Sequence, residues 1–522
     1  MTEARSKMEV DSSVERDVED IVLATEPEYP PLSRVVIIML ALFLAMFLVA
    51  VDQTIIGVAI PKITDQFKYH GYCMVKWAFL AAILIFEAGS LICAVAPSST
   101  VLIVGRAIAG IGVAGIFSGA LVIISMTVPL TKRPLIFGMA GMVWGIASIA
   151  GPLLGGAFTD GVSWRWCFYI NLPVGGLSIV VILLVLRLPS KSEFSGTSIL
   201  GRIRQLDLIG ASLLIPAVVC LLLALQWGGN KYAWNSSRVI GLFVGFGILA
   251  VLFAVSQVYL GEKATLPPHI LKKRTVLSAA SFNLLFGGAF YLLVYYVPIF
   301  FQSVKGSSAM KSGIQLLPLM LATVVSSVLV GGMVTVAGYY TPFLIVSTAI
   351  AAIGTGLITM FDVDIPSGKW IGYQIVVGAG VGAGFQIPMT AVQTVLKLED
   401  IPVGTAALMF FQSLGGALFL AVGQSVFQNG LIDGIRKDAP TVNPKAIIGA
   451  GATEMRHVLG SLGQLDQLDA VIKAYMKGLR DVYRVSLALM VAMFVASCFL
   501  EWKSVKKAGG ESEKDEVAVP AL

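Results

Sequence analysis

The stretch LIVGRAIAGIGVAG, residues 102–115, decides how this chain must fold, because it sets one arginine in a run that is otherwise apolar or glycine. Arg106 stays charged at any pH a protein meets. At the centre of a membrane helix such a charge costs about 2.5–3.5 kcal/mol on insertion scales, so it faces a bundle interior or a water-filled cavity. Small residues recur along this helix and permit close packing of its neighbours. The stretch therefore predicts a tightly packed transmembrane helix with a functional charge; the alternative is a structural arginine bonded to backbone carbonyls.

The composition extends this interpretation to the whole chain. Hydrophobic residues make up 57% of the 522 residues and charged residues only 13%, whereas charged residues are about a quarter of an average soluble domain. We therefore expect an all-α, polytopic membrane protein in a lipid bilayer. The net charge of +6 comes from basic residues clustered between apolar runs. That clustering indicates orientation in the membrane and not a nucleic-acid partner.

Runs of about twenty apolar residues cross a bilayer as helices. The sequence has thirteen candidates: 34–60, 77–96, 101–128, 134–157, 166–187, 207–228, 238–260, 276–304, 312–336, 342–361, 371–395, 403–428 and 482–500. Most tryptophans lie near the ends of these runs, where aromatic side chains meet the membrane interface. Segments 1–33 and 503–522 are then polar tails, and the acidic N-terminal one is expected to be disordered.

Lysine and arginine predict the orientation. They concentrate at Lys132-Arg133, in 187–204, in 263–274 and in the C-terminal tail. Placing these segments in the cytoplasm puts the C-terminal tail inside and makes 430–481 a long non-cytoplasmic loop, and we expect the acidic N-terminal tail to be cytoplasmic as well. The later part of that loop, LDQLDAVIKAYMKGL, looks amphipathic and is expected to lie along the membrane surface.

The alternation of cytoplasmic and non-cytoplasmic loops fails near the N-terminal end of the chain. When the loops are counted back from the C-terminus, segment 62–75 must be cytoplasmic. A first span that starts from a cytoplasmic N-terminal tail would instead place this segment on the non-cytoplasmic side. Its mostly polar residues, KITDQFKYHGYCMV, cannot make the extra crossing. Either the N-terminus lies outside or one helix is missing between Pro61 and Trp77, and we favour the missing helix.

Two acidic residues are candidates for proton coupling with Arg106. Asp52 lies late in the first span and Glu87 lies in the middle of the next. A low dielectric favours the protonated carboxyl, and a nearby arginine favours the ionised one, so a change in their separation moves a proton. The alternatives are a polar helix end for Asp52 and a buried, hydroxyl-bonded carboxyl for Glu87.

The second half contains few charges, so its amides and aromatics are the candidates for a substrate cavity. An aromatic pocket with scattered amides suits an uncharged or weakly cationic lipophilic molecule. The candidates, each of which has ordinary helix interior as its alternative, are Asn283, Tyr295, Phe301, Gln302, Gln386, Gln393 and Gln412. The sequence lacks HExxH, GxSxG and GxxxxGK patterns, and its cysteines lack metal-ligand spacing. We expect no enzyme activity, no cofactor and no metal.

The glycine-rich span 138–156, GMAGMVWGIASIAGPLLGG, carries a recognisable pattern. It resembles the antiporter motif G-x8-G-x3-GP-xx-GG of the major facilitator superfamily, in its fourteen-helix drug:proton antiporter branch, with the fungal toxin and mycotoxin exporters as the nearest type. The matching positions are Gly138, Ala147 in place of a glycine, Gly151, Pro152, Gly155 and Gly156. The runs LIVGRAIAGIG, VDQTIIGVAIP and SWRWCFYINLPVG are similar to the fourth-helix, first-helix and sixth-helix signatures of that branch.

The resemblance implies two six-helix bundles, 34–187 and 275–428 with 482–501, joined by two extra helices in 207–260. It implies a proton-coupled exporter of lipophilic small molecules, driven by protons, monomeric, and located in the plasma membrane or alternatively in a vacuolar or vesicle membrane. The alternatives are a proton-coupled importer of iron chelates or amino acids, or a truncated remnant that does not transport. Asn235 begins an N-x-S triplet on the non-cytoplasmic side and is a candidate glycosylation site.

Members of that family carry a second helix and a G-x-x-x-D-R-x-G-R type motif, where this chain has only KYHGYCMVK, residues 68–76. We predict that transcripts crossing the codons for Asp65 to Trp77 include a frame with roughly thirty additional residues, enough for one helix and a short loop. Long-read transcript sequencing measures this directly. A single transcript class without the insertion would show that the helix is absent from the expressed protein.

Overall fold

The computed structural model describes residues 36–46, 72–129, 132–186, 207–229, 232–261, 264–397 and 400–505. Within these ranges the regular structure is helical, with two isolated β-bridges, Gly228–Tyr232 and Tyr339–Ser504. Eleven helices in the described part are long and apolar enough to cross a membrane. The expected all-α polytopic fold is confirmed.

The first half contains α3 (Tyr72–Ala94), α4 (Ser99–Thr127), α5 (Arg133–Gly161), α6 (Trp166–Tyr169) and α7 (Asn171–Val185). The connecting pair is α9 (Leu208–Trp227) and α10 (Ser237–Leu260). The second half contains α11 (Pro268–Leu271), α12 (Arg274–Ser303), α13 (Ala309–Gln315), α14 (Leu317–Ala337), α15 (Thr341–Ile358), α16 (Ser367–Val381), η4 (Gly382–Phe385), α17 (Ile387–Val395), α18 (Ile401–Asp438), α19 (Pro444–Ser461), η6 (Leu465–Gln467) and α20 (Leu468–Cys498).

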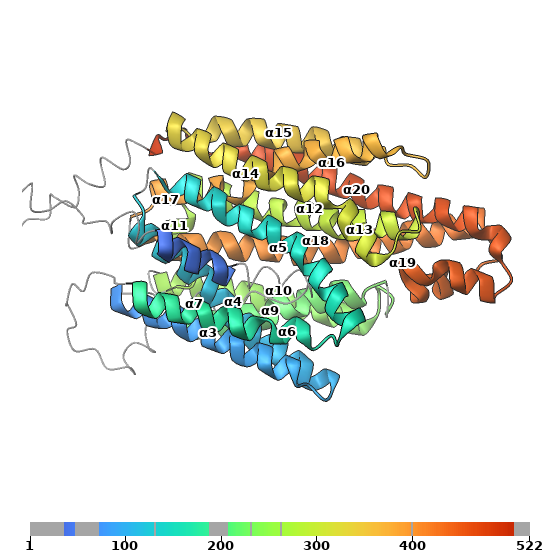
Figure 1. Ribbon diagram of the computed structural model, residues 1–522, viewed down its shortest axis with the longest axis horizontal. Helices are drawn as coiled ribbons and strands as arrows, with labels where there is room; N and C mark the ends of the chain where they lie inside the picture. The colour runs from blue at the N-terminus through green and yellow to red at the C-terminus, as the bar shows by residue number, and fades with distance from the viewer. Residues whose placement is uncertain are drawn as a thin grey trace, which may run out of the picture.

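The helices form two packed groups (Figure 1). One contains α3, α4 and α7, and the other contains α12, α14, α15, α16, α18 and α20, while α5 lies along α14 and so joins them. One apolar core fills the second group. A second core runs from α3 and α4 to residues of α12, α17 and α18. The two groups are therefore sealed together by side chains at one end.

Twelve of the thirteen expected spans coincide with described helices, whereas the first one, 34–60, is described only as Val36–Met46. The 371–395 span is interrupted, because a 3-10 turn separates α16 from α17. The stretch between Pro61 and Gly71, where we expect the missing helix, lies outside the described residues, as do the polar tails 1–33 and 506–522.

Residues 430–481, expected as a long non-cytoplasmic loop with an amphipathic later part, are largely helical. Helix α18 continues to Asp438, and α20 begins at Leu468 and runs unbroken into its membrane span. Small residues explain the extension: a Cβ on Gly430 would lie 2.9 Å from Gly478 Cα, and one on Gly434 would lie 2.7 Å from Ala474 Cβ. Such contacts keep two helices paired beyond the apolar region.

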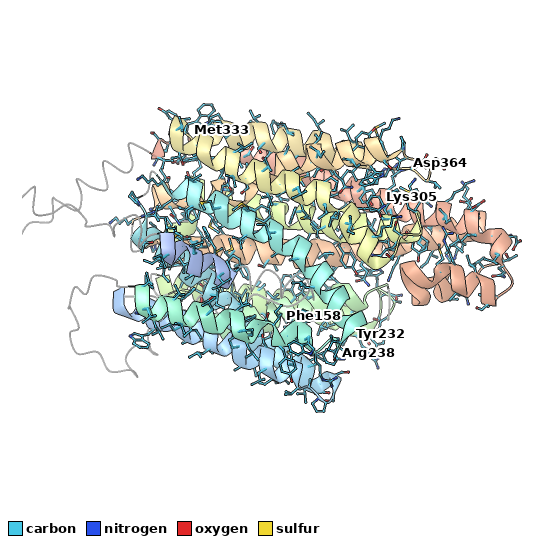
Figure 2. All side chains as sticks on the ribbon, in the orientation of Figure 1. Phe158, Tyr232, Arg238, Lys305, Met333 and Asp364 are labelled. Carbon is cyan, nitrogen blue, oxygen red and sulfur yellow. The ribbon has the colours of Figure 1, made fainter. Side chains whose placement is uncertain are left out.

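The basic segments of the described part that we expect in the cytoplasm, Lys132-Arg133 and 264–274, lie at one end of the molecule. Figure 2 shows Arg238, Lys305 and Asp364 toward one end of the molecule and Met333 toward the other. Since α10 begins and α12 ends at the first end, the segment between them lies at the second. There Lys273 Nζ donates to the Val395 carbonyl at 3.3 Å, and Arg274 Nε donates to that of Phe499 at 3.0 Å. The assignment of this end to the cytoplasm stays a prediction.

Asp207 fixes the connecting helices to the second half. As N-cap of α9, its Oδ1 accepts the Gly210 N–H at 2.5 Å. Its Oδ2 accepts from Gln257 Nε2 of α10 at 2.7 Å, and from the N–H and hydroxyl of Thr265 at 2.9 and 2.8 Å. Burial alone would raise the pKa of this carboxyl, but the hydrogen bonds outweigh it and the net effect is a lowered pKa.

We predict that Asp207→Asn lowers the free energy of unfolding by about 1–2 kcal/mol at neutral pH, because a charged cap with several donors is lost. The folded pKa lies below the unfolded one, so this stabilisation is complete above the ordinary carboxyl pKa and disappears as the pH falls through the lowered value. Thermal unfolding in detergent at several pH values measures it, with Asp364→Asn as an exposed control. Equal destabilisation at pH 7 and at low pH would contradict the ionised carboxyl.

Candidate functional site

The α3–α4 pair positions two of the three candidate coupling residues. Its glycines bring the two backbones together: a Cβ on Gly105 would lie 2.7 Å from Cys93 Sγ, and one on Gly119 would lie 2.7 Å from a Phe79 ring carbon. Gly89 and Gly112 meet the partner backbone in the same way. Because small residues allow this approach, the rotation of each helix, and with it the direction of Glu87 and Arg106, is fixed by contact.

Glu87 is buried, 8% exposed, on the side of α3 that meets α7. Its carboxylate lies directly against Gly175, so closely that a Cβ there would overlap its oxygens. One turn away, Asn171 Nδ2 donates to Ser90 Oγ at 3.1 Å, and both residues are buried. Glu87 therefore belongs to a polar strip between α3 and α7, and Gly175 makes the space for its carboxyl.

Arg106 is half-buried on α4. Its guanidinium carbon is 5.9 Å from the centre of the Phe168 ring, within the range of a cation–π contact. Nearby, Arg165 donates through Nη2 to the Ala96 carbonyl at 3.1 Å and stacks over Trp164 at 4.6 Å. The cation thus faces a neighbouring helix, as expected from its cost in lipid. Asp52, its proposed partner, lies outside the described residues.

The glycine-rich motif lies on α5, the helix that joins the two halves. Gly138 meets α14 so closely that a Cβ would lie 2.9 Å from the Ser327 carbonyl oxygen. Ser327 Oγ lies 3.2 Å from the Gly138 carbonyl and 2.5 Å from Gln386 Oε1, and the Gln386 amide donates to the Ser327 carbonyl. Ala147 and Gly151 are also buried, and α5 continues through Pro152, Gly155 and Gly156 to Gly161. The backbones of α5 and α14 therefore approach closely at Gly138.

Arg133 was not a candidate from sequence, because a basic residue next to Lys132 indicated only membrane orientation. In the structure it is 5% exposed at the start of α5. Its Nε donates to the Val128 carbonyl at 3.0 Å and its Nη1 donates to Gln393 Oε1 at 3.4 Å. The pair links the two halves at the end where the basic segments gather. The Pro134 that follows it, a residue favoured at the first helical turn, was the available signal that Arg133 begins a packed helix.

The proposed cavity residues occupy several environments. Gln386 and Gln393 take part in the contacts between halves described above, and Asn283 Nδ2 donates to the Leu408 carbonyl at 3.4 Å. Gln302 Nε2 donates to Ser312 Oγ at 2.8 Å. Gln412 is half-buried on α18, where its backbone carbonyl meets Gly287 of α12. The side-chain amides of Asn283, Gln302, Gln386 and Gln393 therefore bond to neighbouring helices.

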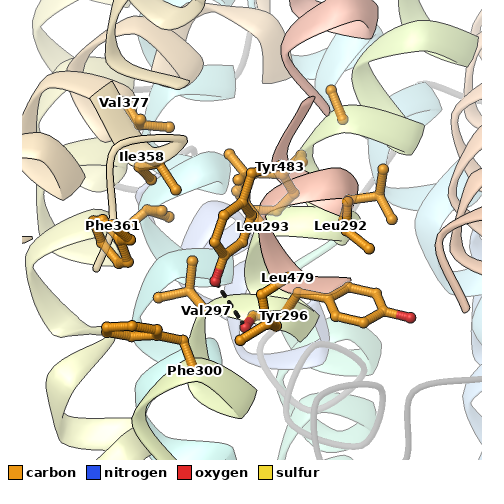
Figure 3. Packing of buried hydrophobic residues seen from close by; sticks show 14 of the residues in the cluster. Leu292, Leu293, Tyr296, Val297, Phe300, Ile358, Phe361, Val377, Leu479 and Tyr483 are labelled. Carbon is orange, nitrogen blue, oxygen red and sulfur yellow. Dashed lines mark hydrogen bonds between the residues drawn. The ribbon is translucent and has the colours of Figure 1, made fainter. Parts of the chain in front are cut away.

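The aromatic candidates are divided between core and surface. Phe301 is fully buried and packs edge-to-face on Trp370 at 4.8 Å, whereas Tyr295 is 56% exposed. Figure 3 shows the surrounding core of α12, in which the Tyr483 hydroxyl donates to the Tyr296 carbonyl at 3.1 Å. The run of aromatics on α12 is mainly the packing centre of the second half.

Asn235 is exposed in the turn before α10, one residue ahead of the N-cap Ser236. Its glycosylation stays a prediction.

Comparisons with known proteins agree with this architecture. The profile of the Major Facilitator Superfamily matches residues 73–420. The chain is 48% identical to the MFS-type efflux pump MFS1 of Arthroderma benhamiae, over 91% of this chain and 92% of that protein. It is 44% identical to the efflux pump aflT of Aspergillus parasiticus, over 91% and 96%, and 43% identical to the efflux pump roqT of Penicillium rubens, over 92% and 93%.

Solved structures show the same fold at low identity. A bacterial homologue of the human lysosomal transporter Spinster, in an inward-facing and unoccupied conformation, matches with a TM-score of 0.52 and 17% identity, over 91% of this chain and all of that one. The proton:xylose symporter XylE matches with a TM-score of 0.52 and 12% identity, over 92% and 99%.

Two adjacent glycines provide a test of the Glu87 site. We predict that Gly175→Ala destabilises the protein by about 1–3 kcal/mol, because the new methyl group overlaps the Glu87 carboxylate. The matched control is Gly176→Ala, whose methyl group would meet nothing within 4 Å. Thermal unfolding in detergent compares the two. Equal effects of the two substitutions would contradict the placement of Glu87 against α7.

Proposed function

The chain belongs to the major facilitator superfamily, and on this basis we propose that it is a proton-coupled antiporter that exports lipophilic small molecules. It is a multi-pass membrane transporter and not an enzyme. The observation that carries the proposal is the combination of relatives named efflux pumps, at 43–48% identity over most of the chain, with the glycine–proline motif on the helix that joins the two halves.

The bundle interface supports transport by alternating access, in which the halves rock around a site near the middle of the membrane. At the end with the basic segments, Arg133 and Gln393 bond across the interface and an apolar core seals it. Export requires this end to open. The contact of Gly138 with α14 then acts as the pivot, because a helix without a side chain at the contact can slide on its neighbour.

Proton coupling is assigned to Glu87, Arg106 and Asp52. Glu87 is an ionisable group buried between α3 and α7, and Arg106 is a fixed positive charge on the adjoining helix. Protonation of an acid removes its attraction for the cation, and a change of helix packing returns the proton. The membrane potential would add about 2.3 kcal/mol per charge moved across 100 mV.

The exported compounds are proposed to be uncharged or weakly cationic and lipophilic, such as toxins or other secondary metabolites. The buried amides of Asn283, Gln386 and Gln393 suit such molecules, because they offer hydrogen bonds without a strong fixed charge. We propose the plasma membrane as the location and a monomer as the working unit.

A second candidate function, a form that does not transport, rests on the second helix that the loop alternation indicates is missing between Pro61 and Trp77. A transporter with one crossing fewer would place segment 62–75 on the wrong side. The two candidates are separated by comparing the chain as it stands with a version that carries the second helix and the following loop of a relative.

We predict that membrane vesicles containing the restored version extrude a lipophilic dye. A protonophore should reduce the extrusion rate at least about tenfold. The variant Glu87→Gln should reduce the rate similarly, because its side chain no longer carries a proton. The control variant is Asp364→Asn, in the exposed α15–α16 loop. Initial rates under a fixed pH gradient are the measurement. Extrusion that ignores the protonophore would exclude proton coupling, and equal rates for the chain as it stands would exclude the need for the extra crossing.

A further inference from the structure

A basic hollow lies where α20 passes the loop between α15 and α16, at the end of the molecule opposite the basic segments (Figure 2, near Asp364). The charged side chains that line it are Lys473, Lys477, Arg480, Asp481 and Arg484 of α20, together with Asp362 of the loop. Four basic side chains of α20 therefore face two carboxylates. None of the candidate site residues lies in this hollow, and neither the fold nor the proposed transport uses it.

The two carboxylates are already engaged. Asp481 Oδ1 accepts from Arg484 Nη1 at 2.8 Å, and Asp362 Oδ1 lies 3.9 Å from Arg480 Nη2. Among the described residues, Lys473 and Lys477 form no salt bridge within 4.0 Å, and both are exposed. The hollow thus has an excess of positive charge directed at its opening, which favours an anionic ligand.

The walls of the hollow are held in place before any ligand binds. Lys305 Nζ at the end of α12 donates to the carbonyls of Val363 and Ile365 at 2.6 and 3.1 Å, and Arg480 Nη2 donates to the Phe361 carbonyl at 3.3 Å. The opposite wall is the continuous helix α20. Preorganised walls reduce the cost of ordering a site on binding.

The size and surroundings of the hollow indicate the ligand. Its volume of about 210 Å³ is below the 300–1,000 Å³ of pockets for drug-sized molecules, so a small anionic group fits and a whole exported molecule does not. The same stripe of α20, at steps of three or four residues, continues from the cations into exposed apolar side chains, namely Ala488, Val491 and Val495. A phosphate at the hollow would therefore sit directly above a lipid-facing apolar surface.

From this arrangement we propose that the hollow binds the phosphate headgroup of a membrane lipid, whose acyl chains lie along Ala488, Val491 and Val495. Lys473 and Lys477 contact the phosphate, and Arg484 lies at the level where headgroup meets acyl chain. A lipid bound here would fix the paired extension of α18 and α20 to one membrane leaflet. The site is independent of proton coupling, so failure of the proposed function leaves it unaffected.

The test measures lipid binding to the purified full-length chain in detergent by native mass spectrometry. The two lipids compared are dioleoyl phosphatidic acid and dioleoylglycerol, which is the same lipid without the phosphate. We expect phosphatidic acid to bind and dioleoylglycerol not to bind at equal concentration. The double variant Lys473→Gln, Lys477→Gln should lower the affinity at least about tenfold, since each basic residue beside an anionic headgroup contributes several-fold. The control double variant Lys311→Gln, Lys437→Gln removes two exposed cations elsewhere at the same end and should change it less than about twofold.

Each other outcome overturns the proposal. Unchanged binding in the Lys473, Lys477 variant, or an equal loss in the control, would show that phosphatidic acid binds elsewhere. Displacement of the lipid by glycerol phosphate at equal concentration would assign the hollow to a free anion. Because both lysines are exposed, the variants should unfold at the temperature of the parent chain without lipid, and Lys477→Glu provides a second variant in which repulsion should abolish the site.

Discussion

The structure depends on one physical constraint: a charge or polar group in the hydrocarbon layer must be enclosed by other helices. Glu87 meets it on helices that approach through glycines and lies against Gly175 of α7, and the Arg106 guanidinium lies over the Phe168 ring of α6. Without that close approach, either residue would face lipid at a cost of several kcal/mol. The glycines are therefore as important to the site as the charges that they enclose.

The second constraint is that two halves must stay joined and still move. They meet through α5, where Gly138 lies on Ser327, and through the pair of Arg133 and Gln393. These are hydrogen bonds to carbonyls and amides and not salt bridges, so each can be exchanged for water or for another amide at a modest cost. An apolar core also seals this end, so in the proposed transport cycle both the core and these hydrogen bonds separate when the end opens.

The sequence predicted the features that length and hydropathy determine. It predicted fewer of the contacts that depend on how each helix is rotated about its axis. The spans were predictable because a segment of about twenty apolar residues can adopt few structures other than a membrane-spanning helix. The extension of α18 and α20 was not, since residues 430–481 are polar and their pairing comes from Gly430 and Gly434 facing Gly478 and Ala474 across a long sequence separation. Glu87 and Arg106 were identified as enclosed charges, but their neighbours Gly175 and Phe168 could not be predicted without knowing which faces meet. Arg133 was missed because exposed and buried arginines at a helix start look alike in sequence.

At the centre of the proposed mechanism, the fixed charge of Arg106 couples proton movement to the change of access. The most direct measurement is proton release or uptake, followed with a pH-sensitive dye in lightly buffered proteoliposomes, when a lipophilic substrate is added to the restored chain and to its Arg106→Gln variant. We predict a stoichiometric proton signal that is lost in the variant while substrate binding persists, because the acid no longer changes its partner. An unchanged proton signal in the variant would contradict this coupling.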